Sequence, residues 1–389
     1  MKSDSFNLLF CGDFAPCRKF EDIVVEKKDK IFGDSLSVIR KADLSFVNLE
    51  CPLTTYSSSI CKSGPSLKAD PDCVHALKFF SLIGLANNHI MDFGKDGLQS
   101  TLEACESIGV PTTGAGVNIK EAKKHHIITV GNLSVAVIAI AEYEFNQAGE
   151  NAGGSAPVDV IDNYHQIMLA KKQADIVIVT LHGGNEYFPY PRPGLRKLCK
   201  HYIDLGVEAV VCHHPHVPGA YEYYKGKPIF YSLGNLIFDN SNPPKHWDLG
   251  YMVNIEINKE KKQISNVKLL PYRQSVELGG LKLLVDEEKE RFLKQIENHR
   301  ETLDDKKKYQ KEWHKFVKYK TNSYLLMQYF PFLFKGLGFI SRNTRFTKLF
   351  VNKSNILAKL NILRCQSHHE VLESILQDQV SNGYVTSKK

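Results

Sequence analysis

The chain has 389 residues, of which 43% are hydrophobic and 24% are charged, and its formal net charge at pH 7 is +7. This composition is typical of a globular protein with a sizeable core, and it excludes mainly disordered, collagen-like and coiled-coil classes. The nine cysteines are scattered and form no C-x-x-C pair, which favours a reducing compartment over a disulfide framework. Because neither a secretory leader nor a run of about 18 apolar residues is visible, we expect a soluble, cytoplasmic protein.

Short apolar runs alternate with segments of helical spacing through the first two-thirds of the chain. The runs predict strands at 7–12, 42–49, 80–86, 134–141, 175–181, 209–212, 228–232 and 251–257. Apolar residues three or four positions apart predict helices at 95–108 and 194–205, and again within 285–320. Strands that alternate with helices indicate an α/β domain, which we expect to cover residues 1–275.

The remaining residues, 276–389, are expected to form a basic, mainly helical extension. Residues 306–364 contain fourteen lysines and arginines against a single acid, Glu312, whereas residues 1–305 are mildly acidic. One interpretation is a helical cap with solvated lysines. Another is peripheral contact with the inner face of a membrane, because basic and aromatic residues interleave there. Nucleic acid is not expected, since no recognition motif accompanies the charge.

Polar residues that suit metal binding follow the predicted strands, at the sheet edge where α/β proteins place their ligands. Taken singly, each of these residues could have a purely structural role as a turn residue, a helix cap or a buried core histidine. Taken together, carboxylates and imidazoles at successive strand ends suit two divalent ions such as Mn, Fe or Zn. Two such ions can hold a hydroxide and clamp a phosphoryl or carbonyl oxygen. The members are Asp13, Glu50, Asn88, His89, His182, His214 and His216.

The order of these motifs resembles the calcineurin-like metallophosphoesterase superfamily, and it is most similar to the CapA branch, the poly-γ-glutamate capsule biosynthesis proteins. The matching blocks are Gly12-Asp13 with Pro16, 42–54, Leu85-Ala86-Asn87-Asn88-His89 through Asp92-Phe93-Gly94, His182-x-Gly184-x-Glu186-Tyr187, His214-Pro215-His216-Val217 and Tyr231-Ser232-Leu233-Gly234-Asn235. The resemblance covers roughly residues 7–270. It implies an α/β fold with a two-sheet β-sandwich flanked by helices (α/β/β/α), and a site on the loops at one end.

The resemblance also implies a role for each matched residue. Six are expected to ligate two divalent ions, one of which is less tightly bound: Asp13, Glu50, Asn88, His182, His214 and His216. Glu50 is expected to bridge the ions. His89 is expected not to bind them, and to protonate a leaving group or stabilise the developing negative charge. Residues expected to support these ligands or touch substrate are Asn48, Asn87, Glu186, Tyr187, His213 and Asn235.

Two positions depart from the family pattern. The wider superfamily begins with Asp-x-His, but residue 15 is alanine, so one metal lacks a ligand, as in the CapA branch. The branch also often has an aromatic residue after the histidine that corresponds to His182, and Gly183 stands there instead. The second departure concerns the shape of the substrate pocket and not the metal ligands.

Two functions remain open from the sequence. The first is a metal-dependent hydrolase in capsule or surface-polymer biosynthesis, which would cleave a phosphoester or, less favoured, an amide or γ-glutamyl bond. The second is a non-catalytic, metal-binding accessory protein that handles poly-γ-glutamate or another anionic polymer. In either case the expected partner is an anionic small molecule or polymer.

Overall fold

The structure, a computed structural model, describes residues 5–62 and 64–329 and the single positions 339, 340, 356, 359 and 363. Its residues form two compact units, Met1–Tyr309 and Gln310–Lys389, and the first contains both large sheets and every predicted site residue. The domain boundary predicted at residue 275 stays a prediction. Most of the basic segment 306–364 lies outside the described residues, and so does much of the predicted extension.

An eight-stranded sheet is built around β1 (Ser5–Ala15). Its order is β16-β15-β14-β1-β2-β3-β4, and β13 pairs with β1 beyond this path. The bounds are β2 (Leu44–Leu49), β3 (Leu82–Gly84), β4 (Thr112–Thr113), β13 (Asn235–Phe238), β14 (Leu249–Asn258), β15 (Gln263–Ser275) and β16 (Gly280–Leu283). Since β1, β2 and β3 run parallel, their carboxyl ends meet at one edge.

A second sheet has six strands in the order β11-β12-β10-β9-β7-β6. The bounds are β6 (His126–Val130), β7 (Leu133–Ala141), β9 (Ile176–His182), β10 (Ala209–His213), β11 (Tyr221–Tyr224) and β12 (Lys227–Phe230). The central strands β7, β9 and β10 are parallel, so their carboxyl ends also lie together. A small separate sheet joins β5 (Ala115–Gly116) to β8 (Gly154–Ser155).

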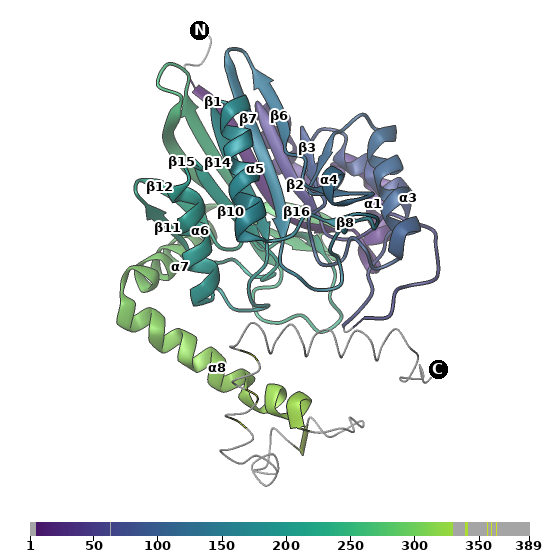
Figure 1. The fold of residues 1–389 in the computed structure, drawn as a ribbon, viewed down its shortest axis with the longest axis vertical. Coiled ribbons are helices and arrows are strands. Elements are labelled where there is room, and N and C mark those ends of the chain that lie inside the picture. Colours follow the sequence, from purple (N-terminus) through teal and green to yellow (C-terminus); the bar gives the residue numbers. More distant parts are fainter. Residues whose placement is uncertain are drawn as a thin grey trace. The chain divides into compact units, whose positions relative to one another are not determined.

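The two large sheets pack face to face. Phe10 of β1, Val137 of β7 and Ile178 of β9 belong to one buried apolar cluster between them. The outer face of the eight-stranded sheet is covered by α1 (Lys19–Lys27), η1 (Lys28–Ser35), α2 (Leu36–Lys41), η2 (Pro71–Leu77) and α3 (Gly94–Ser107). The outer face of the other sheet carries α5 (Val160–Gln173) and α6 (Pro193–Asp204), which lie in front of its strands in Figure 1. This confirms the predicted α/β/β/α fold.

Burial on both faces explains why the central strands were visible in the sequence. In β1, Leu8 and Phe10 point into the core between the sheets, while Leu9 and Cys11 point to the helices. A strand covered on both sides needs apolar residues at successive positions, and such runs were the signal for strands. The long strand β15 was not predicted, because its first residues are largely exposed and polar.

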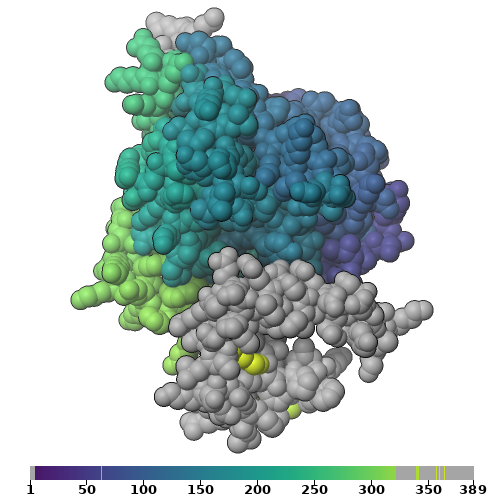
Figure 2. All heavy atoms as spheres, in the orientation of Figure 1, coloured from purple at the N-terminus to yellow at the C-terminus, as the bar shows by residue number. Residues whose placement is uncertain are grey.

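In the space-filling view the side chains close the gaps left between the ribbons (Figure 2).

Three further helices complete the described part of the chain, namely α4 (Ile119–Ala122), α7 (Asp286–Asp304) and α8 (Lys306–Tyr329). Phe292 and Ile296 of α7 enter the core between the sheets, and Leu303 joins the core beneath α6. Helical spacing within 285–320 is thus matched by α7 and α8. Among the described residues, no helix combines the length and apolar character needed to span a bilayer.

Candidate metal centre

The predicted ligands lie at the carboxyl ends of strands from both sheets. Asp13 is near the end of β1, where the pairing with β2 and β13 shifts register, and Glu50 directly follows β2. His182 ends β9, and His214 and His216 follow β10. Because the sheets pack face to face with these edges together, five residues from four distant stretches of the chain converge on one buried point.

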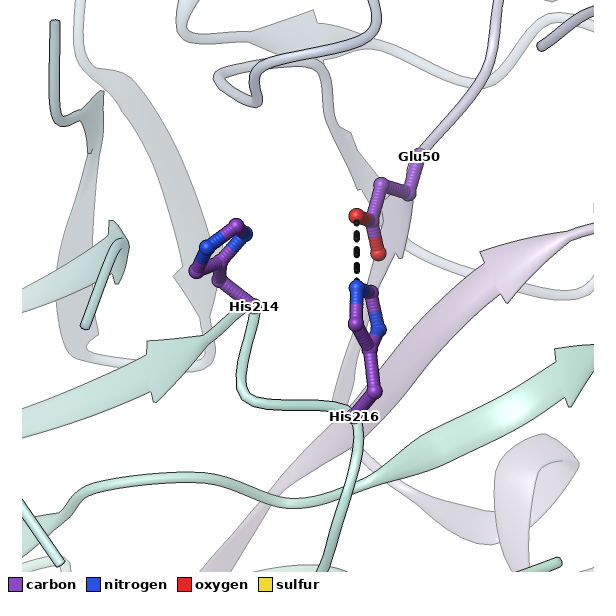
Figure 3. Close-up of side chains that lie close together, drawn as sticks. All are labelled: Glu50, His214 and His216. Atoms are coloured by element: carbon purple, nitrogen blue, oxygen red, sulfur yellow. Dashed lines mark ion pairs between the residues drawn. The ribbon is translucent and has the colours of Figure 1, made fainter. Parts of the chain in front are cut away.

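The potential ligand atoms form two overlapping groups. Asp13, Glu50 and His182 make one, and Glu50, His214 and His216 make the other; within each group the atoms lie within 4.8 Å of one another. Glu50 Oε1 is 3.5 Å from His182 Nε2 and 3.6 Å from His216 Nε2. Figure 3 shows the His216 ring pointing at the Glu50 carboxylate, with His214 on the same loop beside them. Glu50 therefore belongs to both groups.

Asn88 extends the set next to His182. Its Oδ1 lies 3.0 Å from His182 Nε2, and the same nitrogen is 3.2 Å from His214 Nδ1. The Asn88 amide also donates to Glu144 Oε2 at 3.1 Å, which fixes the orientation of the amide. The amide oxygen of Asn88 and the imidazoles of His182 and His214 thus lie together, near the ends of β3 and β9.

The donor set fits a divalent cation. Glu50 is fully buried, and neither carboxylate oxygen has a hydrogen-bond partner among the described residues. Burial, with the nearby Asp13 charge, raises the pKa of Glu50 well above its usual range. A buried carboxylate without a partner is costly, and a bound cation removes that cost. The residues present therefore suit the metal ions that the sequence predicted.

Three other ligands have shifted pKa values that favour the states that bind metals. Burial lowers the pKa of His216 to about 4 and lowers that of His182 well below its usual range, so both imidazoles are neutral at pH 7. Burial tends to raise the pKa of Asp13, but its neighbours His213, His182 and His216 lower that pKa overall. Neutral imidazoles and an ionised carboxylate are the forms that coordinate.

Two asparagines hold the ligands in place. Asn48 donates to Asp13 Oδ1 at 2.7 Å, and its amide nitrogen lies 3.2 Å from His182 Nδ1. Asn235 Oδ1 is 3.0 Å from His216 Nδ1, so the other ring nitrogen of His216 is left facing Glu50. Such contacts from outside the ligand set fix ring orientation and tautomer. His213 also contacts the set, with Nδ1 3.1 Å from Asp13 Oδ1.

Asn87 positions its two neighbours. Its amide donates to the Leu49 carbonyl at 2.8 Å, and its Oδ1 accepts from the His89 backbone N–H at 3.1 Å. This ties the loop after β3 to the end of β2, next to Glu50. His89 Nδ1 lies 2.7 Å from Asp92 Oδ2, which leaves Nε2 as the nitrogen available to a substrate.

Unusual backbone geometry marks the loops that carry the site. His214, His216 and Tyr187 have φ angles of 100°, 60° and 65°, in the left-handed region that side chains rarely adopt. Such strain persists only where the surroundings impose it, and it clusters at functional sites. Tyr187 is 42% exposed, and its ring lies against His216 and Trp247 at centroid distances of 6.5 and 6.2 Å. It therefore lines the approach to the cluster, next to Glu186.

The two departures from the family pattern have structural consequences. Ala15 is buried in the core beneath the helices of the eight-stranded sheet. At Gly183, a Cβ atom would lie 2.5 Å from the Glu142 side chain. That carboxylate accepts from the Gly184 N–H at 3.2 Å and pairs with Arg192 at 2.6 Å. The space beside a Cβ at residue 183 is thus taken by the Glu142–Arg192 pair.

Sequence reasoning gave no role to several residues that contact the cluster. Asp92 could have been found, because it lies three residues after His89 and within a matched block. Lys62, Glu144 and Trp247 carry no such signal, since each comes from a loop and reaches the site only in the folded chain. Lys62 contacts Asp92, Glu144 contacts Asn88, and Trp247 packs on His216 at 5.1 Å between ring centroids.

Residues 7–240 match the family model described as bacterial capsule synthesis protein PGA_cap, and the chain belongs to this family. This confirms the resemblance to the CapA proteins. The chain is 33% identical over 244 residues to the PGA biosynthesis protein CapA of Bacillus subtilis, covering 61% of this chain and 64% of that protein. It is 30% identical over 252 residues to the capsule biosynthesis protein CapA of Bacillus anthracis, covering 61% of each. The chain thus spans less than two-thirds of these relatives.

Two other proteins are more distant. A Mycobacterium tuberculosis protein named as a polyglutamine synthesis accessory protein is 29% identical over 225 residues, covering 54% of this chain and 59% of its own. The crystal structure of the calcineurin-like phosphoesterase YfkN from Bacillus subtilis aligns with a TM-score of 0.44 and 12% identity, covering 81% of this chain and 98% of that one.

Proposed function

We propose that this chain is a hydrolase that depends on two divalent metal ions, of the Mn, Fe or Zn type, and that cleaves a phosphoester of an anionic small molecule or polymer. The observation that carries the proposal is Glu50, a buried carboxylate that is shared by two groups of ligand atoms and forms no hydrogen bond with any residue that the structure describes. A shared carboxylate is what two adjacent ions require. Asp13, Glu50 and His182 would hold one ion, with Asn88 beside His182, and Glu50, His214 and His216 would hold the other.

Bound ions in such a site supply a hydroxide nucleophile and neutralise charge on the phosphoryl oxygens. The protein's own residues do the rest. Asp92 accepts a hydrogen bond from His89 Nδ1, which directs Nε2 away from Asp92. When the ring is cationic, Nε2 carries the second proton and can give it to the oxygen of the leaving group, leaving a neutral ring that is still protonated at Nδ1. Asn48 and Asn235 keep Asp13 and His216 oriented, and Tyr187 lines the entrance. An amide or γ-glutamyl bond is the alternative target of the same groups.

The family and the names of its relatives favour a role in making a capsule or another surface polymer. The M. tuberculosis relative is named as an accessory protein, and Ala15 removes one ligand from the superfamily pattern. A second candidate function is therefore an accessory protein that uses its metals to bind poly-γ-glutamate or a similar polymer without cleaving it. A cytoplasmic location and contact of the basic extension with the inner membrane face stay predictions.

The first test quantifies metals by elemental analysis in protein purified without chelator, for the wild type and His214→Ala. One to two equivalents of Mn, Fe or Zn are expected in the wild type, with loss in the variant. The loaded protein is then assayed on phosphoesters and γ-glutamyl amides, with chelation and His89→Asn as tests of mechanism. Chelation should abolish turnover while the fold is retained.

His89→Asn should keep its metal and lose about 10²- to 10⁴-fold in kcat, the usual contribution of a general acid. Turnover that survives both chelation and His89→Asn would refute the hydrolase. Metal-dependent binding of poly-γ-glutamate with no product released would instead support the accessory function. A protein that takes up no metal, even after reconstitution, would contradict both.

A further inference from the structure

The loop between Glu50 and η2 forms several of its contacts with one residue, Asp92. The Ile60 N–H donates to the Asp92 backbone carbonyl at 2.9 Å, and the Leu67 N–H donates to Asp92 Oδ2 at 2.7 Å. Lys62 Nζ contacts the other carboxylate oxygen, Oδ1. Asp92 thus joins this loop to the turn that carries His89, whose Nδ1 also contacts Oδ2.

Lys62 is an unusual residue to find in this position. Its side chain is only 3% exposed, and that of Asp92 is fully buried. Lysine is rarely buried without a partner of opposite charge, because removing its charge from water is costly. Here Nζ has Asp92 as that partner, and it lies 3.3 Å from His89 Nδ1. The Lys62 ammonium therefore faces the His89–Asp92 pair and is shielded from solvent.

The geometry determines which nitrogen of His89 carries the proton. An ionised carboxylate only accepts hydrogen bonds, so the 2.7 Å contact to Asp92 Oδ2 requires a proton on His89 Nδ1. The competing arrangement has Lys62 donating to a bare Nδ1 at the longer distance of 3.3 Å. Because Lys62 engages Oδ1, it holds the carboxylate in the rotamer that turns Oδ2 toward the ring.

We propose that Lys62 is a positioning residue: it holds Asp92 so that His89 keeps a proton on Nδ1 and directs Nε2 to the substrate. The cationic ring then carries the donated proton on Nε2, and the neutral ring that remains is the Nδ1-protonated tautomer. The inference rests on the proposed function only where it concerns turnover, since the tautomer of His89 can be measured without any substrate. Lys62 acts through Asp92 and His89 and does not itself contact the reacting atoms.

The test compares Lys62→Met with Lys62→Arg and with Lys68→Met. Lys68 is a matched control, because it lies on the same loop and binds the Tyr56 carbonyl at 2.6 Å but does not contact Asp92 in the structure. The first readout is the ¹⁵N signal of His89 in metal-free protein, assigned by its absence from His89→Gln. We expect Nδ1 to be protonated in the wild type and in Lys68→Met, and a mixture of tautomers in Lys62→Met.

The second readout is turnover of the metal-loaded protein on the phosphoester that the wild type cleaves best. Lys62→Met should lower kcat by about 10- to 100-fold with KM and metal content unchanged, the usual effect of losing an orienting partner. Lys62→Arg, which keeps the cation, should recover part of kcat. A Lys62→Met protein that matches Lys68→Met in both readouts would overturn the proposal.

The two proposals fail in different ways. If the wild type cleaves nothing, the hydrolase is refuted, and the ¹⁵N signal still decides the role of Lys62. If Lys62→Met does not fold, the wild-type spectrum is decisive: a proton on His89 Nε2 in place of Nδ1 would overturn the assignment. If Lys62 only stabilises the loop, Lys62→Met should be less stable than wild type while the ¹⁵N signal of His89 is unchanged.

Discussion

At the scale of single residues, Glu50 shows how a site can be recognised without its ligand. The core around it contains apolar side chains, neutral imidazoles and Asp13, and none of the described groups donates a hydrogen bond to its oxygens. Stability alone does not explain a carboxylate there, because a well-packed apolar residue would be less costly. The residue makes physical sense as half of a pair whose other member is a cation.

Replacement of Glu50 by glutamine should separate metal binding from folding. Glu50→Gln removes a charged ligand, so bound metal should fall to a small fraction of the wild-type content in elemental analysis. The metal-free variant should be at least as stable as metal-free wild type, because glutamine has no ionised form for burial to disfavour. Thermal unfolding after dialysis against chelator measures the second effect.

Glu222→Gln serves as the matched control for this prediction. Glu222 is also buried, but it is paired with Arg196, Lys200 and Tyr231 on the outer side of the six-stranded sheet. The same substitution there should lower stability and leave the metal content intact. Full metal content in Glu50→Gln would show that Glu50 is not a ligand.

At the scale of secondary-structure elements, α7 links the two cores of the first unit. Phe292 and Ile296 enter the core between the sheets, while Leu303 packs with residues of α6. Arg196 of α6 donates to the Leu303 carbonyl at 3.0 Å, near the end of α7. The helix therefore packs as part of the first unit, although its sequence is highly charged.

His299 of α7 should make stability depend on pH. Burial lowers the pKa of His299 to about 4, whereas an unfolded histidine has a pKa of about 6.5. Between these values the unfolded chain takes up a proton that the folded chain does not, so the free energy of unfolding falls as the pH falls. His299→Gln should therefore lose less stability than wild type between pH 7 and pH 5. Equal losses in urea titrations at the two pH values would contradict this account.

At the scale of the whole molecule, the candidate metal ligands come from both large sheets. Asp13 and Glu50 come from the eight-stranded sheet, and His182, His214 and His216 from the six-stranded one. A cation held by both groups would act as a cross-link between the layers, in addition to the apolar core that they share. The site is therefore coupled to the stability of the fold as a whole.

Metal binding should raise the thermal stability of the protein by mass action. A ligand that binds only the folded state at 100 times its Kd adds about 2.7 kcal/mol to the free energy of unfolding. Calorimetry should show a lower Tm after chelation and recovery on addition of Mn or Zn. His214→Ala should show a much smaller response to the same metals. An unchanged Tm in metal-loaded and chelated wild type would argue against a metal shared by the two sheets.

Much of this protein could be inferred from its sequence, because the signals are local. A strand buried on both faces requires a continuous apolar run, and the polar residue that ends it is adjacent in the chain, as at Asp13, Glu50 and His182. The central strands, the layered α/β fold and the order of the candidate ligands followed from that rule and from the family resemblance. Strand β15 was missed because exposure removes the apolar signal.

Tertiary structure alone decided which distant side chains meet. The pairing of Lys62 with Asp92, the contact of Glu144 with Asn88, and the use by Glu142 of the space at Gly183 all join loops that are tens of residues apart. No local pattern encodes such contacts, because they depend on how two sheets pack and how their loops close over one edge. The sequence by itself determined the chemical groups available at that edge, and the packing of the sheets determined their distances, burial and charge states.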